Sequence, residues 1–310
     1  MHSEGLDIAG AAPISYIMTI DSASSGRLTH LGVLRFSGAD ALSFLQGQVS
    51  NDTQRLSKNA PLLAAYSSAQ GRVLALIYLL PHSSGVIAIL PREILSTTMQ
   101  RMRKFVLRAK VQIEDAGDSL AVAGHVGEMP QSSSGYTEMD GVGIAPVGHD
   151  KTRHWLVAAA GKLPPSGDAA AAKRIEGEWR LADIRAGLPQ IYAATSEAFV
   201  AQMLNLDLLD GISFTKGCYT GQEIIARTQH LGRIKRRLFR LQLPPGTWEV
   251  GQALRLADGR QGRLTEVAQS NGRIEALAVL SVEPGAALSS DAPTEILVDA
   301  AELPLPYPIR

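Results

Sequence analysis

The stretch Lys216-Gly217-Cys218-Tyr219-Thr220-Gly221-Gln222-Glu223 holds the only cysteine among the 310 residues of the chain. Thr220 and Glu223 have the Thr-x-x-Glu spacing of a capping box, which satisfies free amides at the start of a helix. An apolar run follows, so the spacing predicts a helix that begins just after Cys218. The helix dipole and the Lys216 ammonium both favour thiolate over thiol, which indicates a reactive sulfur. The alternative is a small buried core residue, as most free cysteines are.

Composition restricts the class of protein. Apolar residues make up 45% of the chain and charged residues 19%, which is ordinary for a globular protein long enough for two or three domains. Lys plus Arg and Asp plus Glu number 30 each, so the whole chain carries no electrostatic footprint for nucleic acid or membrane. One cysteine excludes an internal disulfide and an all-cysteine metal site, which fits a reducing compartment.

Targeting and membrane signals are weak. No apolar run approaches the roughly 20 residues that a membrane helix needs. The first residues lack the order of a signal peptide and the composition of a transit peptide. We therefore expect a cytoplasmic protein without a membrane partner, with an amino-terminal tail of uncertain order over residues 1–25.

Helical periodicity and start signals predict three further helices. One spans about residues 39–56, a second begins at Pro91, and a third begins at Asp168 and ends at Gly187. The second carries a basic face of Arg101, Arg103, Lys104 and Arg108. Such a face is usually solvated, and the alternative is contact with an anionic partner.

Short apolar runs predict strands at 73–80, 86–90, 111–114, 119–123 and 155–159, without a regular βαβ rhythm. We therefore expect an α+β fold for residues 26–237, in two subdomains that divide near 161–168. From Leu238 the pattern changes to short alternating segments separated by turn residues. This spacing predicts a small antiparallel β-barrel over residues 238–310.

A run of cations without acids directly follows the predicted helix after Cys218. It is either a solvated linker or a site for an anion such as a glutamate tail, a phosphate or an RNA backbone. No hydrolase elbow, zinc spacing, phosphate loop or dinucleotide fingerprint accompanies it. The cations are Arg227, Arg233, Lys235, Arg236, Arg237 and Arg240.

The chain resembles the YgfZ family of folate-binding proteins from about residue 30 to its carboxyl terminus. The octapeptide 216–223 is the most specific match. One departure is Ala201-Gln202, where the family usually has Pro-Gln, and it concerns local loop geometry. The other matching segments are Leu34–Ala41, Phe44–Gln48, Gln70–Val73, Arg185–Pro189, Asn205–Thr215 and Ile224–Arg227.

The resemblance implies a fold similar to the T-protein of the glycine cleavage system, a multi-domain ring around a folate pocket closed by a carboxyl-terminal barrel. It implies tetrahydrofolate or a one-carbon-substituted folate as cofactor. By this resemblance Cys218 is a nucleophile, a redox thiol or a transient metal ligand, and Lys216 tunes its charge. Expected contacts with the folate are Tyr219, Gln222, Glu223 and Arg227 for the pterin or polar groups and Arg185 for the glutamate end. Two of these have structural alternatives, since Glu223 also suits helix capping and Arg185 suits the end of a helix dipole.

Three functions stay open. The resemblance implies an accessory protein that supports iron-sulfur cluster assembly or maintenance, with iron-sulfur proteins or their assembly factors as partners and an indirect effect on tRNA modification. A folate-dependent aminomethyltransferase is the first alternative, but the segment Gln70–Ala75 lacks the aspartate that T-proteins place beside the amine. An RNA-binding modification factor is the second, supported by the cation run and opposed by the neutral net charge.

Overall fold

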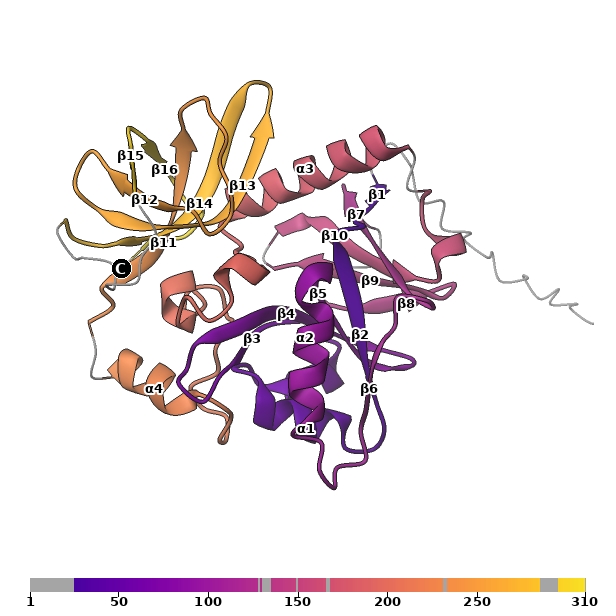
Figure 1. Cartoon of the computed structure of the whole chain (residues 1–310). Coiled ribbons are helices and arrows are strands. Elements are labelled where there is room, and N and C mark those ends of the chain that lie inside the picture. The colour runs from indigo at the N-terminus through magenta and orange to yellow at the C-terminus, as the bar shows by residue number, and fades with distance from the viewer. Residues whose placement is uncertain are drawn as a thin grey trace, which may run out of the picture.

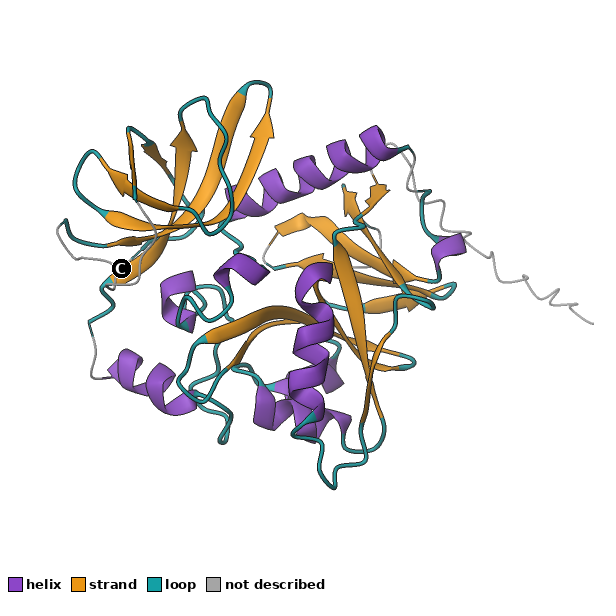
Figure 2. Cartoon of the chain, in the orientation of Figure 1, coloured by secondary structure: helices purple, strands orange, loops and turns teal. Residues whose placement is uncertain are grey.

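A computed structural model describes residues 25–127, 129, 135–148, 150–165, 168–230, 233–284 and 295–309. The tail expected over residues 1–25 lies outside these residues except for Ser25. Helices and strands are mixed, as the predicted α+β class requires (Figures 1 and 2). The described helices are α1 (Ala41–Gln48), α2 (Arg92–Arg103), α3 (Ala169–Ala186) and α4 (Gln222–His230), with short 3-10 turns at Thr53–Lys58, Ala160–Lys162, Ala193–Thr195 and Ala201–Leu204.

Two five-stranded antiparallel sheets form the first part of the fold. The first has the order β3-β4-β5-β2-β6 and the second β1-β7-β10-β9-β8. The first sheet contains β2 (Leu31–Ser37), β3 (Leu62–Ser67), β4 (Val73–His82), β5 (Gly85–Pro91) and β6 (Gln112–Asp115). The second contains β1 (Ser25–Arg27), β7 (Ala121–Val126), β8 (Thr137–Met139), β9 (Val142–Val147) and β10 (Asp150–Ala158).

A chain of aromatic side chains joins these sheets to α3. The Tyr78 ring on β4 lies 5.5 Å from the Trp155 ring on β10, and Trp155 lies 4.9 Å from Trp179 on α3. All three side chains are buried. Each aromatic side chain buries a large apolar area, so this contact is a main source of cohesion between the layers.

The start and end of α3 agree with the sequence signals. Asp168 caps the helix, since its carboxylate accepts a hydrogen bond of 2.7 Å from the Ala171 amide. Gly187 ends it with a φ of +66°, a left-handed conformation that favours glycine. Figure 1 shows α3 running between the second sheet and the carboxyl-terminal sheet.

The helix predicted over residues 39–56 is wrong in extent. Helix α1 ends at Gln48 because Val49 is extended and forms a β-bridge with Tyr66 on β3. A 3-10 turn begins only at Thr53, capped by the Asp52 side chain. Pairing with a distant strand therefore overrides the helical periodicity of this segment.

The carboxyl-terminal sheet is curled and has the order β15-β12-β13-β14-β11-β16 (Figure 2). It differs from the predicted antiparallel barrel in one pair, since β12 and β15 are parallel. Its end strands, β15 and β16, do not pair with each other among the described residues. Its strands are β11 (Arg236–Leu243), β12 (Ala253–Leu256), β13 (Gln261–Ser270), β14 (Arg273–Ser281), β15 (Ile296–Val298) and β16 (Ala301–Leu303). The domain boundaries drawn from the sequence stay predictions.

Candidate functional site around Cys218

The octapeptide 216–223 packs against two other segments of the first sheet region. Gly221 has a φ of +82°, and a Cβ atom there would lie 2.6 Å from the Ser68 carbonyl oxygen in the turn between β3 and β4. On the other side, the Thr220 amide donates a 3.2 Å hydrogen bond to the Gly47 carbonyl near the end of α1. The segments around Gly47, Ser68 and Gly221 therefore meet at one place, although the first and the last lie more than 100 residues apart in the sequence.

Lys216 anchors the octapeptide to the end of α1. Its ammonium donates hydrogen bonds of 2.7 to 2.8 Å to the carbonyls of Gln46, Val49 and Asn51. It also lies 4.9 Å from the centre of the Tyr219 ring. Burial lowers the pKa of Lys216 to about 8, and the Asp52 carboxylate opposes that shift. Gln46 lies in the last turn of α1, where carbonyls lack partners within the helix, and Val49 and Asn51 lie just after it.

Cys218 is a free cysteine at the surface, so the buried-core alternative does not hold. Its neighbour Tyr219 is buried, and burial raises the pKa of the phenol to about 12. Among the predicted folate contacts, Gln222 is half-buried, and Glu223 and Arg227 are exposed on α4. Cys218 therefore lies in solvent between the exposed Gly217 and the buried Tyr219.

Helix α4 begins at Gln222, slightly later than the Thr220 signal predicts. No hydrogen bond between Thr220 and Glu223 occurs in the described part of the chain, so the capping box does not form. Gly221, at positive φ, packs closely against the β3–β4 turn directly before the helix. Glu223 is consequently free of the capping role that was its structural alternative.

Buried polar atoms around the octapeptide lack partners. The Ser67 hydroxyl and the side-chain oxygens of Gln48 and Gln202 have no hydrogen-bond partner among the described residues. Ser67 lies beside Gly221, and the Gln202 amide group donates 2.7 Å to the Ile225 carbonyl in α4. A buried polar atom without a partner is costly, and it is expected where a ligand or an ordered water binds.

Sequence reasoning missed these three side chains. Gln48 and Gln202 lie in segments that the resemblance singled out, and Ser67 ends β3 shortly before Gln70. Their positions in or near those segments were the only signal in the sequence that could have pointed to the site. Burial without a partner becomes visible only in three dimensions.

The structure does not bring Arg185 to this site. Near the end of α3, its guanidinium donates 2.8 and 3.1 Å hydrogen bonds to Glu275 on β14. Glu275 also pairs with Arg240 on β11. In the described contacts Arg185 therefore links α3 to the curled sheet, and its predicted role toward folate stays a prediction.

The cation run 227–240 does not form one continuous patch. Arg237 is buried and pairs with Asp207 at 2.6 Å, Arg240 pairs with Glu275, and Arg233 pairs with Glu283. Arg236 has a pKa lowered by burial and then by the nearby charge of Arg72 from the β3–β4 turn. Half of the run thus serves internal ion pairs, which weakens its interpretation as an RNA surface.

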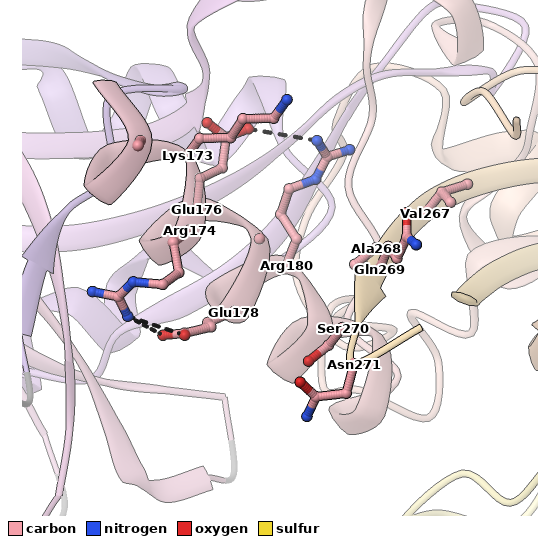
Figure 3. Close-up of a pocket in the computed structure, with 12 residues that line it drawn as sticks. Lys173, Arg174, Glu176, Glu178, Arg180, Val267, Ala268, Gln269, Ser270 and Asn271 are labelled. Atoms are coloured by element: carbon pink, nitrogen blue, oxygen red, sulfur yellow. Dashed lines mark hydrogen bonds and ion pairs between the residues drawn. The ribbon is translucent and has the colours of Figure 1, made fainter. Parts of the chain in front are cut away.

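A concavity of about 920 Å³ lies between α3 and β13 (Figure 3). Charged side chains line it, and several of them pair internally, Arg174 with Glu178 and Arg180 with Glu176. The octapeptide does not line it.

The described residues contain no cluster of three or more His, Cys, Asp or Glu suited to a metal ion. Within the same residues, no helix is long and apolar enough to cross a membrane.

Proteins named tRNA-modifying protein YgfZ are similar over most of this chain. The protein from Yersinia pestis strain Pestoides F is 30% identical in an alignment of 304 positions that covers 89% of this chain and 89% of its own. That from Hamiltonella defensa is 30% identical in an alignment of 250 positions that covers 74% of this chain and 71% of its own. The chain belongs to the YgfZ family. No family model matches it.

The fold of this YgfZ chain is that of the glycine cleavage T-protein. Aminomethyltransferase T from Bartonella henselae superposes with a TM-score of 0.53 at 13% identity, covering 84% of this chain and 79% of that one. The predicted relation to the T-protein fold is thereby confirmed. The central ring around a pocket stays a prediction.

Proposed function

We propose that this YgfZ protein is a tetrahydrofolate-binding accessory protein in the cytoplasm that supports iron-sulfur cluster assembly or maintenance, and through it tRNA modification. The observation that carries the proposal is the exposed Cys218, held on a T-protein fold where three segments distant in the sequence meet beside buried polar atoms without partners. An exposed thiol in a fixed backbone suits thiolate chemistry or transient ligation of a soft metal.

The residues near Cys218 fit a reduced folate. A pterin ring presents N–H donors and ring acceptors, and Gln48, Ser67 and Gln202 offer buried polar atoms without partners. We propose that these side chains, with Tyr219, Gln222, Glu223 and Arg227, hold the folate, and that Arg185 stays the weaker candidate for its glutamate end. Bound tetrahydrofolate supplies a carrier for one-carbon groups.

Transfer of an aminomethyl group is the less favoured alternative. Leu74 and Ala75 on β4 stand where T-proteins are expected to have an aspartate, and both are buried apolar residues. No carboxylate at this position orients or deprotonates an amine. Folate-dependent release of ammonia from an aminomethylated carrier at an enzymatic rate would favour the transferase instead.

The folate proposal predicts thermal stabilisation. Tetrahydrofolate should raise the melting temperature with the logarithm of its concentration, since a ligand that prefers the folded state must do so. Ser67→Ala removes a buried hydroxyl that has no partner, so the free protein should keep its stability while the folate-induced shift falls.

The matched control is Ser96→Ala on α2, which should keep the whole shift, since Ser96 accepts only an exposed hydrogen bond from Gln100. Absence of any shift at folate concentrations far above the physiological range, together with no heat of binding by calorimetry, would remove folate from this account.

A further inference from the structure

The loop between α2 and β6 lies at the lower side of the molecule in Figure 1 and carries both basic and apolar exposed residues. We define the tip as residues 104–110. Phe105 is 50% exposed and Leu107 is 89% exposed. Lys104, Arg108 and Lys110 are exposed as well, and their side chains have no ion pair among the described residues. No acidic residue lies between Glu93 and Glu114.

The backbone of the tip is fixed and strained. Leu107 has a φ of +43°, a left-handed conformation that is uncommon for residues other than glycine, asparagine and aspartate. Turn hydrogen bonds on both sides hold it, from the Val106 amide to Arg103 at 3.2 Å and from the Ala109 amide to Val106 at 2.8 Å. Strain of this kind concentrates at functional positions, and here its effect is to project an apolar side chain into solvent.

The tip is tied to the helix that also anchors the octapeptide. The Lys110 amide donates 2.7 Å to the Asp40 carboxylate, directly before α1. The other end of α1 accepts the hydrogen bonds of Lys216. Eight helical residues span roughly 12 Å at 1.5 Å per residue. Two further exposed apolar side chains belong to the segments that these hydrogen bonds join: Leu42 lies on α1, and Phe214 lies two residues before Lys216.

We propose that the tip docks into another protein that offers an apolar pocket rimmed by Asp and Glu. Phe105 supplies an aromatic side chain of the type that is enriched at protein interfaces, and Leu107 supplies an exposed apolar side chain on a fixed backbone. The three cations supply the complementary rim. A nucleic acid offers phosphates but no hydrocarbon pocket for a leucine. Because the whole chain is neutral and the tip holds three bases and no acid, acids outnumber bases over the rest of the chain, which opposes close approach of a uniformly anionic membrane or nucleic acid.

The proposal extends beyond folate binding and does not depend on it. A photoreactive benzophenone amino acid replaces Leu107 in the full-length protein, which is irradiated in cells. The matched control carries the same group at Leu297 on β15, which is 74% exposed and outside the tip. We expect a discrete protein adduct at position 107, about tenfold stronger than at position 297. The adduct should map by mass spectrometry to a surface segment rich in Asp and Glu.

Charge exchange then decides whether the contact is specific. Lys104→Glu with Arg108→Glu should remove the adduct, and changing the mapped acids of the partner to lysine should restore it. Leu107→Gly should relieve the backbone strain, keep the melting temperature and weaken co-purification of that mapped partner. The proposal is overturned by an adduct that nuclease digests or that extracts with lipid, by equal adducts at 107 and 297, or by failure of the charge exchange. A lower melting temperature of Leu107→Gly would also overturn it, since Leu107 would then be structural.

Discussion

At the scale of single residues, Lys216 was expected to tune the charge of the Cys218 sulfur, but the structure gives its ammonium other contacts. Its ammonium is directed to three backbone carbonyls at the end of α1 and lies over Tyr219. Its observed contacts hold the octapeptide in place. An influence of Lys216 on the charge of Cys218 stays a prediction.

Replacing Lys216 tests this anchoring role. Lys216→Met should destabilise the fold by roughly 2 to 3 kcal/mol, because it removes charged hydrogen bonds and leaves carbonyls without partners. Urea unfolding measures the change. Lys162→Met is the matched control, since Lys162 donates to one exposed carbonyl, that of Asp140, and should cost little. Equal effects of the two substitutions would contradict the anchoring role.

At the scale of elements, the fold is predictable where local signals decide it. Asp168 and Gly187 bracket α3 as expected, since capping and a left-handed glycine act within one turn of the helix. The end of α1 at Gln48 was not predictable, because a bridge from Val49 to Tyr66 determines it. The parallel pairing of β12 with β15 likewise depends on contacts between distant residues.

The candidate site likewise combines features that local sequence predicts with features that depend on contacts between distant residues. Cys218 and the segments around it were identifiable from the sequence, since they stand in a distinctive motif. The packing of Gly221 on the β3–β4 turn was not, because it depends on how two segments about 150 residues apart approach each other. The same holds for the unpartnered atoms of Gln48, Ser67 and Gln202.

Two glycines of the octapeptide give a matched pair of tests. Gly221→Ala should destabilise the protein by roughly 1 to 3 kcal/mol or more, because a Cβ atom at positive φ would meet the Ser68 carbonyl. Gly217→Ala should change stability by no more than about 0.5 kcal/mol, since a Cβ there meets nothing within 4 Å. Denaturant melts of both variants measure the difference, and a tolerated Gly221→Ala would contradict the observed packing.

At the scale of the whole molecule, a network of ionisable side chains joins the first sheet to the curled sheet through α3. His30, just before β2, lies 3.6 Å from Glu176 on α3. One turn further along α3, Arg180 binds the buried Glu266 on β13, which also accepts a 2.6 Å hydrogen bond from Tyr192. Removing one member of such a buried pair leaves an uncompensated charge, so the network opposes separation of the two parts.

This network predicts a pH dependence through His30. Burial, and then the positive charge of Arg180, lower the pKa of His30 to about 4 from its usual 6.5. Between these values the unfolded chain binds a proton that the folded chain does not. Stability is therefore complete above pH 6.5 and falls as the pH drops toward 4, by on the order of 3 kcal/mol.

His30→Gln isolates this contribution, since it keeps a neutral side chain of similar size that does not titrate. Its unfolding free energy should vary less between pH 6.5 and 4 than that of the unchanged protein. Parallel pH profiles of the two proteins would show that His30 does not titrate in the folded state as proposed.

The most direct test of the account is the amount of modified tRNA in cells that lack their own YgfZ and carry Cys218→Ser of this chain. Because Cys218 is exposed, the substitution should leave the melting temperature and the folate-induced shift nearly unchanged. A hydroxyl cannot replace a thiolate as nucleophile or soft metal ligand, so tRNA modification should stay at the level of cells without the protein. Full restoration of modified tRNA by Cys218→Ser would contradict the account.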